Sequence, residues 1–164
     1  MSVIATLVVG ANGATSLKGS SSGLSTQADR DRFLQLHRSA GAYIVGRKSA
    51  SVESYRNSLA PIFIFTRQPI PNIAGEVDVS QGFEKAVREI SNAHPSPIVV
   101  ESGVSLMMAM INDGVIDQLQ LSLSPIVGDG DFIDLDQLLE RFEIESDIEI
   151  DGTRLLECRY KGNA

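Results

Sequence analysis

Hydrophobic residues along this chain occur in two alternating patterns. Short unbroken runs rich in Val and Ile are typical of strands that are buried on both faces of a parallel sheet. Apolar residues that recur three and four positions apart instead predict helices that bury one side. The helix caps are predicted at Ser25 or Thr26, Ser49 and Ser80. Strands are predicted at 3–9, 42–45, 61–66 and 98–100, with a short one at Val77, and helices at 25–39, 49–55, 80–93 and 104–111.

The last third of the chain has a different pattern. Residues 116–125 alternate between apolar and polar, which predicts a strand with one polar face, and a short helix is predicted at 135–142. Two further alternating runs, 143–150 and 153–161, flank Asp151-Gly152, and Asp-Gly between alternating strands indicates a β-hairpin. The order of elements predicts an α/β fold with a mainly parallel central sheet and a closing antiparallel hairpin.

Length and composition favour one domain over residues 1–164. The net charge of −7 argues against a nucleic-acid surface, which needs a positive field. Cys158 is the only cysteine, and the two histidines, His37 and His94, lie far apart in the sequence, so neither a disulfide nor a metal site is predicted. The apolar start at 1–10 lacks a basic segment and is too short to span a bilayer, which predicts a cytoplasmic protein that does not bind membranes.

The most informative stretch runs from Pro97 to Gly114, where a buried strand turns at 101–103 into a helix. Gly103 lets the backbone come close to a ligand, and the free N–H groups of the first helical turn favour an anion such as a phosphate. The alternative is a plain strand-to-helix connection with a glycine that packing requires. The pattern alone does not separate the two interpretations.

Two other predicted strand ends carry groups that suit the same kind of ligand. Gly46-Arg47-Lys48-Ser49 offers two cations and a hydroxyl, and Thr66-Arg67 offers another of each. Ligands of open α/β sheets bind beyond the carboxyl ends of the strands. Together with Ser102–Ser105, these ends suit an adenine dinucleotide with an extra 2′-phosphate. Neither a Rossmann nor a Walker glycine motif is present. The Ser- and Gly-rich segment 16–23 is either a surface linker or a mobile flap over a pocket.

Several short motifs, in order and spacing, resemble those of a known family. The chain is similar to the dihydrofolate-reductase-like fold, and more closely to the reductase domain of bacterial bifunctional riboflavin-pathway deaminase/reductases. The motifs that carry the resemblance are Ala11-Asn12-Gly13, Gly19–Ser25 leading to Asp29, Ala42–Gly46, Val100–Leu106, Gly114–Leu119 and Ser124–Gly128.

The resemblance implies a three-layer fold and an NADPH-dependent reductase acting on the ribosylamino carbon chain of a pyrimidine phosphate. It also implies a homodimer with the late strands at its interface. Proton transfer is expected from Glu101 or Asp29, although a solvated loop acid and a carboxylate that complements the helix dipole are the respective alternatives. The cofactor is expected to contact Val8, Gly46, Arg47, Lys48, Ser49, Thr66, Arg67, Ser102, Gly103, Val104, Ser105 and Leu106, and the substrate Ser21, Gly23, His37 and Arg38.

This chain departs from the family pattern at three places. Asn12 replaces an Asp, Ser102 replaces a Gly, and His37 with the adjacent Arg38 stands where the family has an arginine for the substrate phosphate. A mostly neutral histidine holds a dianion less well than an arginine does. Two other functions therefore stay open: a dihydrofolate reductase, and a catalytically silent binding or assembly module that keeps the fold.

Overall fold

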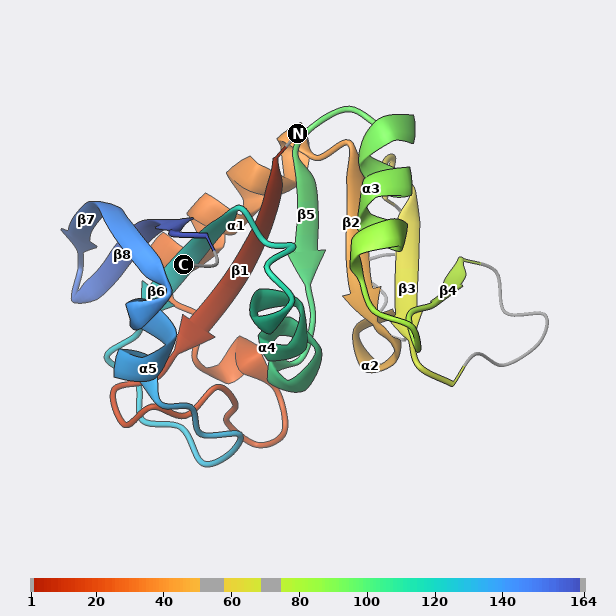
Figure 1. Ribbon diagram of the computed structural model, residues 1–164. Coiled ribbons are helices and arrows are strands. Elements are labelled where there is room, and N and C mark those ends of the chain that lie inside the picture. The colour runs from red at the N-terminus through yellow and green to blue at the C-terminus, as the bar shows by residue number, and fades with distance from the viewer. Residues whose placement is uncertain (1, 51–57, 69–74, 163–164) are drawn as a thin grey trace. The chain divides into compact units, whose positions relative to one another are not determined.

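The buried apolar runs form the strands of a mainly parallel sheet in the computed structural model, which describes residues 2–50, 58–68 and 75–162 (Figure 1). Over these residues eight strands hydrogen-bond in the order β4-β3-β2-β5-β1-β6-β8-β7. The predicted α/β fold with an antiparallel C-terminal hairpin is confirmed. The strands are β1 (Val3–Val9), β2 (Ala42–Gly46), β3 (Ile62–Thr66), β4 (Glu76–Asp78), β5 (Ile98–Glu101), β6 (Gln118–Leu123), β7 (Phe142–Ile150) and β8 (Thr153–Tyr160).

The helices follow the segments with helical periodicity. The longest, α1, begins after Thr26, whose hydroxyl accepts a hydrogen bond from the Asp29 N–H at 3.3 Å, as expected for the predicted cap. None of the described helices combines the length and the hydropathy needed to cross a membrane. The helical segments are η1 (Ser21–Gly23), α1 (Gln27–Ser39), α2 (Arg47–Ala50), α3 (Glu84–Ala93), α4 (Val104–Asn112) and α5 (Leu135–Glu140).

The chain divides into two compact units, and β1 contributes to both. The first unit contains the residues up to Ala5 and Ser39–Ile116; the second contains Thr6–Arg38 and the residues from Asp117 onward. Each unit is described by itself below. The expectation of a single domain over the whole chain stays a prediction.

The first unit is built on parallel strand pairs. β5 lies between β1 and β2, with Ile98 opposite both Val3 and Ala42, and β3 pairs with β2 on one side and β4 on the other. The β-branched side chains of β5 are fully buried, as expected for a central parallel strand. α3 packs beside β3 through Phe83, whose ring stacks on Phe65 with centroids 6.1 Å apart.

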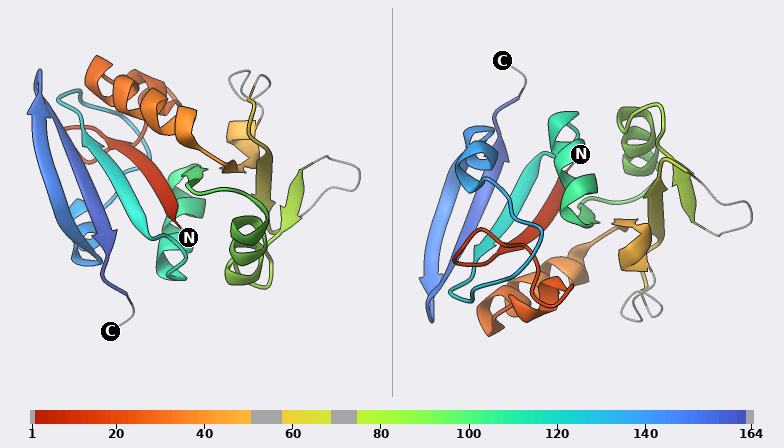
Figure 2. Two further views of the ribbon diagram at one scale, coloured as in Figure 1. Left: turned by 90° about the horizontal axis from the view of Figure 1, so that it is seen from above. Right: turned by 90° about the horizontal axis from the view of Figure 1, so that it is seen from below.

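The second unit holds the antiparallel strands. β8 pairs with β6 and with β7, and both views in Figure 2 show β7 and β8 side by side. Asp151 and Gly152 connect them with φ angles of 50° and 84°, the left-handed conformation that a tight hairpin turn requires. α1 reaches this sheet through the Thr26 hydroxyl, which lies 2.8 Å from that of Thr153.

Two predicted helix caps are wrong. Phe83 is the residue before α3, while Ser80 lies in a turn where its N–H donates to the Asp78 carboxylate at 2.9 Å. Burial of the Phe83 ring fixes where this helix begins, and no side chain caps it. α2 begins at Arg47, ahead of Ser49, and the rest of its predicted length lies outside the described residues.

Cys158 is buried in β8, and burial raises the pKa of its thiol to about 11. In the unfolded chain a thiol titrates near 8.5, so between roughly pH 8.5 and 11 the unfolded state loses a proton that the folded state keeps. We therefore expect Cys158 to lower the stability progressively as the pH rises through this range. Urea unfolding at pH 7.5 and pH 10 measures this, and Cys158→Ala should remove the part of the difference due to the thiol. Rapid reaction of the native thiol with a disulfide reagent at pH 8 would contradict this expectation.

Candidate cofactor site

The turn between β5 and α4 is open to a ligand. Gly103 is the residue before α4, no side chain caps the helix, and the Ser102 hydroxyl donates instead to the Gly103 carbonyl at 3.1 Å. The first N–H groups of a helix have no partner within it. A Cβ added at Gly103 would meet nothing within 4 Å, and its φ of −59° suits any residue. Neither packing nor backbone conformation requires glycine here, which argues against the interpretation as a packing glycine.

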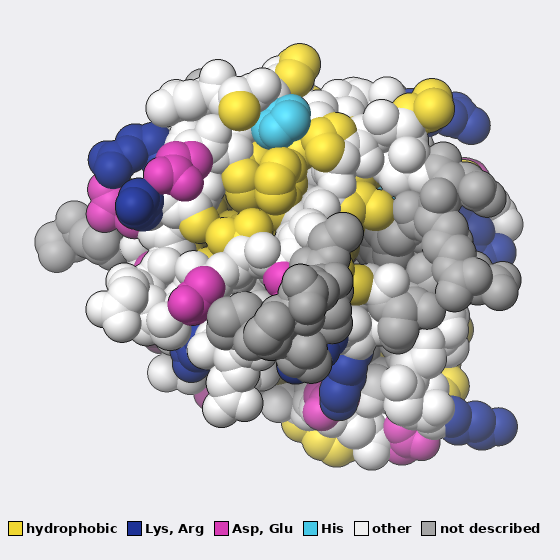
Figure 3. All heavy atoms as spheres, turned by 90° about the vertical axis from the view of Figure 1, so that its right-hand side faces the viewer, with side chains coloured by type: hydrophobic (Ala, Val, Ile, Leu, Met, Phe, Trp, Pro, Cys, Tyr) yellow, Lys and Arg dark blue, Asp and Glu magenta, His cyan; other side chains and the backbone are white. Residues whose placement is uncertain are grey.

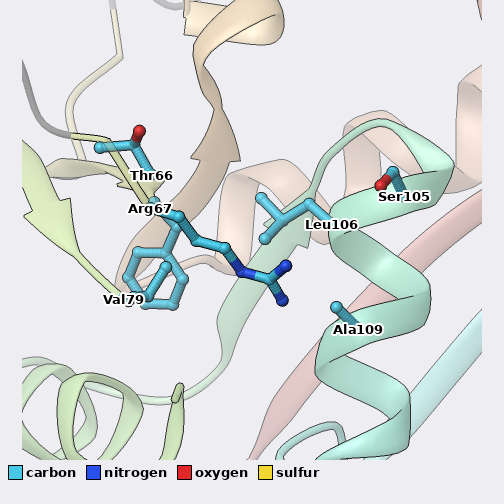
Figure 4. A pocket seen from close by; sticks show the side chains of 7 residues that line it. Thr66, Arg67, Val79, Ser105, Leu106 and Ala109 are labelled. Atoms are coloured by element: carbon cyan, nitrogen blue, oxygen red, sulfur yellow. The ribbon is translucent and has the colours of Figure 1, made fainter. Parts of the chain in front are cut away.

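A pocket of about 210 Å³ lies between the end of β3 and the first turns of α4 (Figure 4). Thr66 and Arg67 line it from β3, and Ser105, Leu106 and Ala109 line it from α4. The Arg67 side chain extends toward α4 in Figure 4. Two of the three strand ends predicted to hold one ligand are therefore brought together here.

The end of β2 lies against the same helix. A Cβ at Gly46 would be 3.6 Å from the Leu106 side chain, an ordinary contact. The next residue, Arg47, is engaged elsewhere: its Nε donates to Glu76 at 3.1 Å, and its Nη2 donates to the Gln68 carbonyl at 2.6 Å. Lys48 is exposed on α2, and the Ser49 side chain lies outside the described part of the structure.

Glu101, at the end of β5, is a buried carboxylate with 6% exposure. It pairs in register with Val45, and Tyr43 lies two residues earlier on β2, so its ring shares that face of the sheet. Burial raises the pKa of Tyr43, the Glu101 charge raises it further, and a hydrogen bond to Ser58 opposes the shift. Glu101 is therefore not the solvated loop acid that was the alternative interpretation.

In the second unit, Asp29 is part of a polar network that ties α1 to the sheet. Its two carboxylate oxygens accept hydrogen bonds from the hydroxyls of Ser25 at 2.6 Å and Ser122 at 2.5 Å. Arg32, one turn further along the helix, donates to Ser122 at 2.8 Å and to the Leu156 carbonyl at 3.0 Å. Burial lowers the pKa of Arg32, while the Asp29 charge opposes that shift. Asp29 thus does more than complement the helix dipole, because it joins α1 to β6.

This network predicts a stability effect for Arg32→Met. The substitution removes two hydrogen bonds from a charged group, each of which contributes roughly 1.5–3 kcal/mol when desolvated. Because Arg32 is only half-buried, we expect a loss of about 1–3 kcal/mol in the free energy of unfolding, measured by urea denaturation. Arg30→Met is the matched control, since Arg30 is exposed on the same helix. Equal midpoints for the two variants would show that the network adds no stability.

The predicted substrate residues also belong to the second unit. Ser21 and Gly23 are exposed in η1, and Arg38 is exposed on the last turn of α1. The His37 ring packs on Phe33 with centroids 4.3 Å apart. Asp29 and His37 are two helical turns apart, about 12 Å along the axis of α1. Val8, predicted to contact the cofactor, is half-buried on the part of β1 in this unit.

The structure gives a role to one departure from the family pattern. The Asn12 amide donates to the Gly128 carbonyl at 2.9 Å and accepts from the Gly128 N–H at 3.1 Å. A carboxylate could not donate the first of these bonds. The segment after it is also tied down, since the Asp129 carboxylate accepts from the Lys18 N–H at 3.0 Å. Segment 16–23 is therefore hydrogen-bonded to the loop after β6 and is not a free linker.

Basic side chains do not merge into one positive surface on the face shown in Figure 3. There, Lys and Arg lie singly or beside Asp and Glu among the described residues. Positive charge in the candidate site is therefore local, and Arg67 is the only charged side chain among the described residues that line the pocket.

Sequence reasoning missed four residues that shape these sites: Arg32, Ser122, Glu76 and Tyr43. Only Arg32 carried a signal, because its position three residues after Asp29 places both on one face of a helix. The others act through partners far away in the sequence.

Comparison with known proteins agrees with this architecture. No family model matches the sequence, and no curated protein matches it significantly. A pyrimidine reductase-like protein from Corynebacterium diphtheriae superposes with a TM-score of 0.75 at 16% identity, covering 99% of this chain and 92% of the other. A dihydrofolate reductase from Enterococcus faecalis, complexed with NADP(H), gives a TM-score of 0.66 at 13% identity, with coverage of 98% and 97%.

A longer protein from Thermotoga maritima also matches. It is a diaminohydroxyphosphoribosylaminopyrimidine deaminase/5-amino-6-(5-phosphoribosylamino)uracil reductase, with a TM-score of 0.73 at 12% identity. The match covers 97% of this chain but only 56% of the Thermotoga chain, so this chain spans about half its length. At these identities the likeness concerns the fold. The chain therefore has the dihydrofolate-reductase-like fold that its motifs predict, and its structure resembles those of riboflavin-pathway and pyrimidine reductases.

Proposed function

We propose that this protein is an NADPH-dependent reductase whose substrate is a phosphorylated aminopyrimidine of the 5-amino-6-(5-phosphoribosylamino)uracil type. The observation that carries the proposal is the pocket where Arg67 lies opposite the uncapped first turn of α4. A helix N-terminus and a cation suit the two phosphate groups of a phosphorylated dinucleotide. The structural likeness to reductases supports the same class of reaction.

The residues present fit such a cofactor. The N–H groups of Val104–Leu106 would bind its pyrophosphate, and Arg67 with Thr66 would hold its adenosine end. When bound, NADPH would supply the hydride, and the protein would supply orientation and a dry surrounding.

A proton must also reach the substrate, and we assign this step to Glu101. Both oxygens of Asp29 already accept hydroxyl hydrogen bonds, so Asp29 serves better as a positioning residue that holds α1 on β6. Glu101 is a buried acid directly before the turn that would bind the pyrophosphate. The expected signature of Glu101→Gln is lost turnover with NADPH affinity retained, whereas Asp29→Asn should lower stability as well as turnover.

Cofactor binding and turnover test the proposal separately. Titration calorimetry with NADPH and NADH measures binding, and loss of NADPH absorbance at 340 nm (a property of the reduced nicotinamide) measures turnover on the aminopyrimidine and on dihydrofolate. We expect NADPH to bind and only the aminopyrimidine to be reduced. Turnover of dihydrofolate alone would make the protein a folate reductase. Cofactor binding without either turnover would make it a silent module, and no binding of either nucleotide would overturn the proposal.

We also propose that two copies associate through the β7–β8 hairpin. β7 is the edge strand of the sheet, and Ile144, Ile148 and Ile150 are 45–55% exposed on it. An edge strand with exposed apolar side chains is a template for pairing with another chain. Sedimentation should show a dimer that Ile148→Lys converts to a monomer. A monomeric wild-type protein at every concentration tested would contradict this.

A further inference from the structure

Two arginines flank the end of β3, and the structure treats them differently. Arg47 reaches from the start of α2 and donates hydrogen bonds to three acceptors: Glu76 at 3.1 Å, the Thr66 hydroxyl at 3.3 Å and the Gln68 carbonyl at 2.6 Å. The Glu76 side chain is only 3% exposed, while that of Arg47 is 45% exposed. Arg47 is therefore the counter-ion of a buried carboxylate.

This pairing limits what Arg47 can do for a ligand. A buried carboxylate left without its partner is strongly unfavourable, so Arg47 is not free to turn toward a bound phosphate. A phosphate placed against Arg47 would also feel the negative charge of Glu76. What Arg47 does instead is hold Thr66 and Gln68, the residues on either side of Arg67.

Arg67 is in the opposite situation. It forms no hydrogen bond or ion pair with the described residues, and its guanidinium lies 5.9 Å from the centroid of the Phe83 ring. The Phe83 ring is itself buried and stacked on Phe65, so it provides a fixed platform. A guanidinium that rests on an aromatic ring keeps its N–H donors available at its edge. In Figure 4 this group extends into the pocket toward α4.

We propose, resting on the proposed function, that Arg67 distinguishes a 2′-phosphorylated adenosine from an unphosphorylated one, and that Arg47 is a positioning residue for Arg67 and Thr66. The cofactor preference of this protein then depends on one arginine, although two lie beside the same strand end. Glu76 is the residue that withdraws Arg47 from phosphate recognition.

Half-cofactor ligands test this without catalysis. The probes are 2′,5′-ADP and 5′-AMP, which differ by the 2′-phosphate, and titration calorimetry gives the ratio of their affinities. We expect the wild-type protein to prefer 2′,5′-ADP by about 10- to 100-fold, as one charged hydrogen-bonded pair provides. Arg67→Gln should bring the ratio close to one while leaving the 5′-AMP affinity nearly unchanged.

Arg47 variants should give the other pattern. Because Arg47→Gln leaves Glu76 unpaired and can unfold the protein, the double variant Arg47→Gln/Glu76→Gln serves as the neutral replacement of the pair. We expect both probes to weaken by a similar factor and the ratio to survive. A ratio lost in the double variant but kept in Arg67→Gln would overturn the inference, as would a wild-type ratio of one with both probes bound. Absence of binding by either probe, with NADPH and NADH also unbound, would instead overturn the proposed function.

Discussion

Replacing Gly103 with Val is expected to weaken NADPH binding by about 10- to 100-fold and to leave the fold intact. A pyrophosphate on the first turn of α4 must approach the backbone closely, and a side chain at 103 would occupy that space. Losing one or two charged hydrogen bonds gives this range of affinity. Stability should change little, because nothing lies within 4 Å of the added Cβ and φ is −59°. Titration calorimetry with NADPH measures the first effect and urea unfolding the second.

A graded series and a second ligand make this result specific. Gly103→Ala should weaken NADPH binding less than Gly103→Val. Both variants should bind 2′-AMP as the wild-type protein does, because its phosphate belongs near Arg67. Unchanged NADPH affinity in Gly103→Val would show that the start of α4 does not hold the pyrophosphate. Equal loss of 2′-AMP binding would indicate general damage to the site.

Local sequence information is sufficient for the elements that frame this turn. The strand predicted at 98–100 and the helix predicted at 104–111 are β5 (Ile98–Glu101) and α4 (Val104–Asn112). The apolar period changes from an unbroken run to three-and-four spacing within a few residues, and a glycine separates the two. The hairpin turn at Asp151-Gly152 was predictable for the same reason, since its backbone conformation depends on those two residues.

The engagement of individual charges was not predictable from the sequence. Arg47 and Arg67 are equivalent cations in the sequence, and their difference comes from Glu76, which lies 29 positions after Arg47. That contact needs β3 and β4 to pair in one particular register, with Thr66 opposite Asp78. The same holds for Asp29, whose partner Ser122 lies 93 residues away on β6.

The wrong cap of α3 has a related cause. Ser80 has the residue type of a helix cap, but the turn at 78–82 uses its backbone for a bond to Asp78. The Phe83 ring gains more by stacking on Phe65 than a capped helix end would contribute, because burial of a large aromatic ring contributes roughly 1.5–3 kcal/mol and a cap about 1. A cap preference read from sequence is therefore overruled where an adjacent aromatic ring finds a partner.

Replacing Gly41 with Ala is expected to be the most destabilising single-methyl change in the first unit for which the structure gives a cause. A Cβ at Gly41 would lie 1.7 Å from the Pro95 carbonyl oxygen and 2.6 Å from its carbonyl carbon. Both atoms belong to backbone, so the clash is relieved only if the connection before β2 or the one before β5 shifts. The Gly41 N–H donates to the Pro97 carbonyl at 2.9 Å, and a shift would strain this bond too. We expect a loss of about 3 kcal/mol or more in the free energy of unfolding, measured by urea denaturation.

Gly103→Ala is the matched control, because it adds the same methyl group where the structure leaves open space. Alanine restricts the unfolded chain more than glycine, which favours folding by roughly 0.4–1 kcal/mol at both positions, while loss of a glycine cap opposes this at 103 by a similar amount. The control should therefore unfold close to the wild-type midpoint, and the difference between the two variants measures the clash with Pro95. Equal midpoints would mean that the two connections are further apart in solution than the structure has them. A large loss for Gly41→Ala alone would show that the close approach of the two connections is required for stability.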